Sequence, residues 1–124
     1  MNTVLWVLQM VLAVVFAAAG IVKIALPRDR LKATMGDWVD PVPAPAIKLL
    51  GLAELAAAVG LVVPPLVSVA PILTPLAAIG VVIVLAGAIV THGRRHEYPN
   101  IAVNVVLAVA AAVVIWGRFG PYAF

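Results

Sequence analysis

Between Glu54 and Arg94 the chain contains no aspartate, glutamate, lysine or arginine. The first segment, from Met1 to Val22, also lacks all four residue types. Uncharged apolar stretches longer than about 18 residues are typical of helices that cross a lipid bilayer. Because the hydrocarbon offers no water to the backbone, such a span satisfies its own hydrogen bonds by forming a helix. These stretches predict an all-α membrane protein.

The composition agrees with this class of protein. Of the 124 residues, 65% are hydrophobic and 10% are charged, whereas soluble domains are about 45–50% apolar and about 25% charged. The net charge of +3 does not indicate a nucleic-acid partner, because the basic residues lie next to the hydrophobic segments, where they set membrane topology. The absence of cysteine excludes disulfides and thiolate metal sites within the chain.

Prolines and polar linkers divide the chain into four hydrophobic segments. Pro64, Pro65 and Pro71 divide the long uncharged stretch, because proline disfavours a helical residue before it. We therefore predict one integral membrane domain over residues 1–124, a four-transmembrane-helix bundle with spans at about residues 3–25, 44–63, 72–91 and 100–116. A cleaved signal peptide is the alternative interpretation of the first span, although the basic region of such a peptide is missing.

The linker from Pro27 to Asp40 is too polar to cross a membrane. Leu31, Met35 and Trp38 recur at helical spacing on one face, which predicts a short interfacial helix between the first two spans. Gly36 weakens that pattern, and a plain loop is the alternative. The basic residues collect in this linker and between the third and fourth spans, so the positive-inside rule places both linkers in the cytoplasm and both termini outside. The outer half is expected to bury almost no polar groups.

Glu54 is a lone carboxylate near the middle of the second span. A charge at that depth costs several kcal/mol unless it is paired, protonated or hydrated. Lys23 lies near the inner end of the first span, and Gly20 and Gly51 stand three residues before the two charges, where small residues let helices approach closely. We expect a Lys23–Glu54 ion pair. It could fix the helix neighbours, or Glu54 could bind and release a proton.

Three more polar residues are expected in the same half of the bundle. His92 ends the third span and is either an ordinary interfacial histidine or a proton-transfer group. Asn100 and Asn104 stand one turn apart as a helix N-cap and an interhelical hydrogen-bonding residue, or as ligand contacts. A metal site would need His92, His96 and Glu97, but a glycine between the histidines breaks their helical register, and no metal site is predicted.

The order of these features resembles the DoxX-like family of small four-helix bacterial membrane proteins. The resemblance covers nearly the whole chain and is carried by Gly20-x-x-Lys23, Gly51-Leu-Ala-Glu54, His92-Gly-Arg-Arg-His-Glu97 and Gly117-Arg118. It implies a four-helix bundle in the bacterial inner (cytoplasmic) membrane. Related proteins are linked to quinone-coupled thiosulfate oxidation and to membrane complexes that handle thiol or oxidative stress. The absence of cysteine argues against a direct thiol role here.

Three function classes remain open from the sequence. The preferred hypothesis is a protein that binds a lipophilic small molecule, with quinone as the candidate cofactor, through Lys23, Glu54, Asn100 and Asn104 in the cytoplasmic half. The second is a membrane enzyme, such as an isomerase, an epoxide hydrolase or a cyclase, with Glu54 as general acid or base and His92 returning the proton. The third is a homo-oligomer or an accessory subunit of a larger membrane complex.

Overall fold

The computed structural model describes all 124 residues and is entirely helical, with no strand. Its four long helices are each apolar and long enough to cross a membrane, which confirms the predicted all-α fold with four candidate spans. They are α1 (Asn2–Ala25), α3 (Ala44–Leu66), α4 (Leu73–Arg94) and α5 (Tyr98–Phe119). Between α1 and α3 lie the short helix α2 (Arg28–Met35) and the 3-10 turn η1 (Asp37–Val39).

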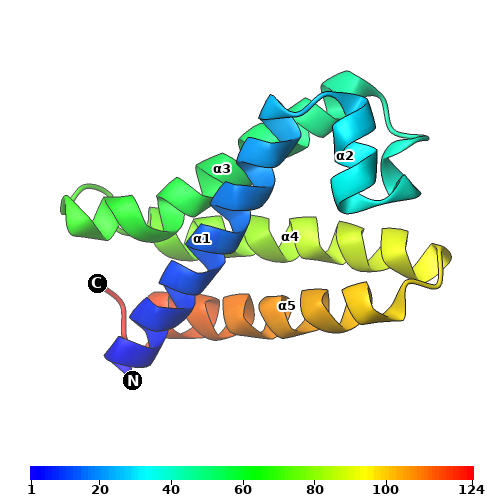
Figure 1. The fold of residues 1–124 in the computed structure, drawn as a ribbon. Helices are drawn as coiled ribbons and strands as arrows, with labels where there is room; N and C mark the ends of the chain where they lie inside the picture. The colour runs from blue at the N-terminus through cyan, green and yellow to red at the C-terminus, as the bar shows by residue number, and fades with distance from the viewer.

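The long helices form two packed pairs, α1 with α3 and α4 with α5 (Figure 1). We call the end with α2, η1 and the α4–α5 turn the basic end. The end with both termini and the α3–α4 turn is the terminal end. In Figure 1, α1 crosses the α4–α5 pair obliquely and diverges from α5 toward the basic end. The closest approach of α1 to α5 is at the terminal end, where Leu5 lies against Gly117.

Helices α1 and α3 cross at two glycines. A Cβ atom on Gly20 would lie 2.6 Å from the carbonyl oxygen of Gly51, and one on Gly51 would lie 2.9 Å from the carbonyl oxygen of Gly20. Any larger residue at either position would push the two backbones apart. The predicted close approach at these glycines is confirmed, and it fixes the positions of the charged residues one turn further along each helix.

Helix α3 extends past its predicted end. The sequence predicted that the span would stop before Pro64, but α3 continues to Leu66 with Pro64 and Pro65 inside its last turns. Neither proline has an N–H, so the carbonyls four residues earlier, on Gly60 and Leu61, cannot accept their helical hydrogen bonds. In a membrane-spanning helix such carbonyls need another donor.

Side chains from two neighbouring helices supply these donors. The Thr74 hydroxyl at the start of α4 donates to the carbonyl of Gly60 at 3.1 Å. The Gln9 amide of α1 donates to the carbonyl of Leu61 at 2.7 Å. The helix therefore continues through both prolines because its neighbours satisfy the carbonyls that the prolines leave free.

The predicted short helix between the first two spans is present as α2. It ends at Met35 because Gly36 adopts a φ of +105°, a conformation that favours glycine. Leu31 of α2 and Val39 of η1 are buried against Ile47 of α3. The apolar face of this segment thus packs on the protein itself, at the basic end of α1 and α3.

Candidate functional site

A cavity of about 760 Å³ lies between the α1–α3 pair and the α4–α5 pair. All four long helices line it, together with residues from α2, η1 and the turn that follows η1. The lining includes every polar residue that the sequence singled out for binding or catalysis: Lys23, Glu54, His92, Asn100 and Asn104. The fold thus brings these residues, from all four spans, around one space.

Lys23 and Glu54 form a buried ion pair. Lys23 Nζ lies 2.7 Å from Glu54 Oε1, and the two side chains are 8% and 6% exposed. Glu54 Oε1 is fully buried, and the ammonium of Lys23 is its close polar partner. Lys23 Nζ also lies 5.9 Å from the ring centre of Trp38. The pair compensates both charges in the wall of the cavity.

His92 is held by the turn between α4 and α5. The backbone N–H of Glu97 donates to the carbonyl of His92 at 2.9 Å, which folds the turn back on itself. The same turn places His92 Nδ1 3.1 Å from Glu97 Oε1. With its proton on Nδ1, the imidazole donates to this carboxylate and keeps Nε2 as an acceptor. From the sequence, Glu97 was expected only as a candidate metal ligand, and its pairing with His92 was not predicted.

The second histidine of this motif lies apart from the first. Helix α4 ends at Arg94, and His96 adopts a positive φ of 57° outside the helix. His96 Nδ1 lies 3.1 Å from the Tyr98 hydroxyl and does not line the cavity. No group of three or more histidine, cysteine, aspartate or glutamate side chains has a metal-binding arrangement.

The two asparagines do not have the structural roles considered for them. Helix α5 begins at Tyr98 with Glu97 as its N-cap residue, so the interpretation of Asn100 as the N-cap is wrong. Pro99 explains the earlier start, because proline is favoured in the first helical turn. The Asn104 amide makes no hydrogen bond to another helix, and the Asn100 amide makes none either. Both amides line the cavity with donors and acceptors that the protein does not use.

Apolar side chains line the rest of the cavity. Phe16, Leu85 and Leu107 lie at its deeper part, toward the middle of the spans. Val15, Ile83 and Val103 also line it and are at the same time among the exposed apolar residues of their helices. Since the surface of these helices is suited to lipid, the cavity communicates sideways with the hydrocarbon as well as with the basic end.

The terminal end carries a buried polar cluster, contrary to the expectation that the outer half would bury almost no polar groups. Gln9 and Arg118 are 0% and 3% exposed. Arg118 Nε donates to Gln9 Oε1 at 2.8 Å, and its Nη1 donates to Asn2 Oδ1 and the carbonyl of Tyr122. The guanidinium carbon lies 3.9 Å from the ring centre of Phe124. This cluster contains no carboxylate side chain, and none of its residues lines the cavity.

The DoxX-like family matches the chain over residues 7–114. This range includes every residue of the cavity lining. No curated protein and no solved structure matches the chain. The family match is therefore what the comparisons provide, and the ligand is inferred from the site itself.

Proposed function

This chain belongs to the DoxX-like family of membrane proteins, and from that premise we propose that it binds a lipophilic small molecule in the cavity between its two helix pairs. One observation carries the proposal. The cavity brings together the buried or half-buried polar side chains of Lys23, Glu54, His92 and Asn104, one from each long helix, while apolar side chains form most of the rest of its wall. Ligand sites typically enclose about 300–1,000 Å³ and combine apolar walls with a few placed polar groups.

The lining suggests which kind of molecule fits. The polar groups stand toward the basic end, and the deeper part is apolar, so an amphiphile would place its polar group beside Lys23 and Glu54 and its tail toward Leu107. The exposed Val15 and Ile83 at the cavity edge would admit such a molecule from the bilayer. We therefore propose a membrane-dissolved ligand with a small hydrogen-bonding head.

A quinone is the first candidate of this kind. Its ring carbonyls are acceptors, and Asn104 and Lys23 offer donors at the cavity wall. The Glu54 carboxyl group in the cavity wall would accept a hydroxyl hydrogen from the reduced form. Both redox states of such a head would thus find partners in the same place.

We further propose that the protein resides in a bacterial cytoplasmic membrane with its basic end in the cytoplasm and both termini outside. Support comes from the basic residues around α2 and the α4–α5 turn, including Arg28, Arg30, Lys32, Arg94 and Arg95. Under the positive-inside rule these residues remain on the cytoplasmic side. The cavity mouth would then face the cytoplasm.

Catalysis on an apolar substrate is the second candidate function. The observation that favours it is the His92–Glu97 pair at the edge of the same cavity that holds Glu54. Glu54 would exchange a proton with the substrate, and His92, oriented by Glu97, would return it from the aqueous side. In this interpretation the cavity is a reaction site for an isomerase, an epoxide hydrolase or a cyclase.

Binding can be tested by fluorescence. Of the three tryptophans only Trp38 lines the cavity, whereas Trp6 and Trp116 lie near the terminal ends of α1 and α5. In a variant with Trp6→Phe and Trp116→Phe, a short-chain ubiquinone analogue titrated into nanodiscs should quench Trp38 with saturation. Asn104→Leu removes a head-group contact without breaking a bond in the protein, and it should weaken binding about tenfold, the effect of one hydrogen bond to a polar ligand.

The control is Val109→Leu, a change at a lipid-exposed position of the same helix. It should leave the quenching curve unchanged. Linear quenching without saturation, equal in all variants, would mean that the quinone only partitions into the lipid. That result would contradict the proposal for this ligand class.

A further inference from the structure

The linker between α1 and α3 forms one rim of the cavity. We call this linker, from Pro27 to Pro43, the cap; it contains α2 and η1. The cap contributes Thr34, Met35, Trp38 and Val42 to the lining. Across from it, the ends of α4 and α5 that flank their turn contribute Thr91, His92 and Asn100. The mouth of the cavity at the basic end therefore lies between the cap and the α4–α5 turn.

The cap is fastened firmly to the α1–α3 pair. The Arg28 guanidinium donates to three carbonyls of the chain beyond η1, those of Val39, Asp40 and Val42, at 3.0, 3.2 and 2.7 Å. Leu31 is buried in the apolar cluster that includes Ile47 of α3. These contacts hold the cap together as one unit on that side of the cavity.

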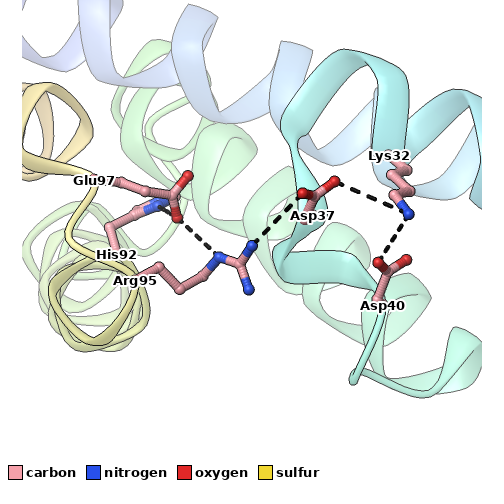
Figure 2. A network of polar contacts seen from close by, with 6 residues as sticks. All are labelled: Lys32, Asp37, Asp40, His92, Arg95 and Glu97. Atoms are coloured by element: carbon pink, nitrogen blue, oxygen red, sulfur yellow. Dashed lines mark hydrogen bonds and ion pairs between the residues drawn. The ribbon is translucent and has the colours of Figure 1, made fainter.

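Toward the α4–α5 turn the cap has a single polar contact. Arg95 Nη2 lies 3.9 Å from Asp37 Oδ2, and no other hydrogen bond or ion pair joins the cap to α4 or α5 (Figure 2). The remaining ionic contacts stay on one side of the mouth: Lys32 with Asp37 and Asp40 in the cap, and Glu97 with His92 and Arg95 in the turn. Arg95 is thus the one residue that bridges the two rims.

The bridging pair is placed where it can open. Its side chains are 37% and 66% exposed, and ion pairs of that exposure are weak and exchange readily with water. Asp37 directly follows Gly36, whose φ of +105° and lack of a Cβ allow the backbone to turn there. A Cβ atom on Gly36 would lie 4.0 Å from Glu97 Oε2, so this part of the cap lies beside the opposite rim.

We propose that the Arg95–Asp37 pair is a latch across the cavity mouth, and that separation of these two side chains opens the cavity to the aqueous phase. The role of the latch rests on the proposed function, since the latch would control the passage of molecules between the ligand site and the water at the basic end. The latch is nevertheless a property of the protein alone, and it can be measured without any ligand.

The absence of cysteine in the chain makes the test direct. Ala88→Cys places a reporter thiol in the cavity wall, and a membrane-impermeant sulfonated maleimide reaches it from water in nanodiscs. Arg95→Gln and Asp37→Asn should each accelerate labelling about two- to fivefold, the effect of losing one exposed ion pair. Arg95→Lys, which keeps the charge, should return the rate most of the way to that of the unchanged latch.

Two controls separate the latch from general effects. Arg94→Gln removes the same charge from the neighbouring residue, which forms no ion pair, and should not accelerate labelling. Ala33→Cys, an exposed thiol on α2, should react at one rate in every variant. Equal cavity labelling in Arg95→Gln and Arg94→Gln would overturn the latch. If instead the latch effect is found and no quinone binds, only the proposed function fails.

Discussion

Each end of this bundle buries one cation, and the two ends satisfy it in opposite ways. At the basic end, Lys23 is paired with a carboxylate, Glu54, beside a cavity of about 760 Å³. At the terminal end, Arg118 has no carboxylate side chain beside it; amide and carbonyl oxygens accept its hydrogen bonds, and an aromatic ring covers its guanidinium. The first arrangement leaves the Asn100 and Asn104 amides of the cavity wall without protein partners. The second uses Nε and Nη1 of Arg118 in hydrogen bonds and leaves Nη2 buried without one.

The difference supports the proposed division of roles, with stability at the terminal end and ligand binding at the basic end. The Gln9 amide donates to the carbonyl of Leu61 and accepts from Arg118, so it ties α1 to α3 and α5 at once. Asn104 has the same chemistry at the other end and makes no bond within the protein. The half-buried Asn104 amide therefore has free donors and an acceptor for a molecule in the cavity.

The largest expected effect concerns the ion pair at the basic end. Glu54→Leu leaves Lys23 buried without its partner and should lower the free energy of unfolding by about 3–5 kcal/mol, whereas the double change Lys23→Met with Glu54→Leu should restore most of it. Denaturation in mixed detergent micelles measures both variants. If Glu54→Leu alone is as stable as the original chain, Lys23 must be hydrated through the cavity, and it does not depend on its ion pair with Glu54.

Next in size is the pair of amides at the two ends. Gln9→Leu strands the carbonyl of Leu61 and removes an acceptor from Arg118, so it should cost about 2–3 kcal/mol. Asn104→Leu strands nothing and should change stability by less than about 0.5 kcal/mol. The same denaturation assay compares them. Equal losses of unfolding free energy in the two variants would contradict the distinction between a stabilising terminal end and a binding basic end.

The smallest effect is the pH dependence of the cap. The hydrogen bond and charge of Asp40 raise the pKa of Lys32, with a smaller contribution from Asp37. A raised lysine pKa means that the Lys32–Asp40 contact stabilises the cap at neutral pH and is lost as the pH rises through that pKa. NMR titration of the Lys32 side chain should show Asp40→Asn lowering its midpoint more than Asp29→Asn does. If Asp29→Asn lowers the midpoint more than Asp40→Asn does, the Lys32–Asp40 contact is not the main cause of the raised pKa.

Much of the basic end could be predicted from sequence because its signals are local. Gly20 and Lys23 are three residues apart, as are Gly51 and Glu54, so one helical turn relates each small residue to its charge. Uncharged runs and prolines likewise located the spans. The start of α5 was placed two residues late, because Asn100 is a good N-cap residue while Pro99 favours an earlier first turn.

The terminal cluster was not predicted because its residues are far apart in the sequence and meet only in the folded bundle. Arg118 near the end of a span is ordinarily an interfacial anchor, and nothing in the sequence states that Gln9 meets it. One indication was present: two prolines inside a span leave two carbonyls without donors, which requires donors from other helices. Gln9 and Thr74 fill that requirement, but only the packing of the helices identifies them.

The most direct test of the account is the Trp38 quenching titration carried out on Gln9→Leu and Asn104→Leu side by side. If the basic end binds the quinone and the terminal end stabilises the fold, Asn104→Leu keeps the stability of the original chain and loses about tenfold in quinone affinity. Gln9→Leu, measured below its unfolding temperature, then binds as the original chain does. A loss of affinity in Gln9→Leu equal to or greater than that in Asn104→Leu would contradict the assignment of the two ends.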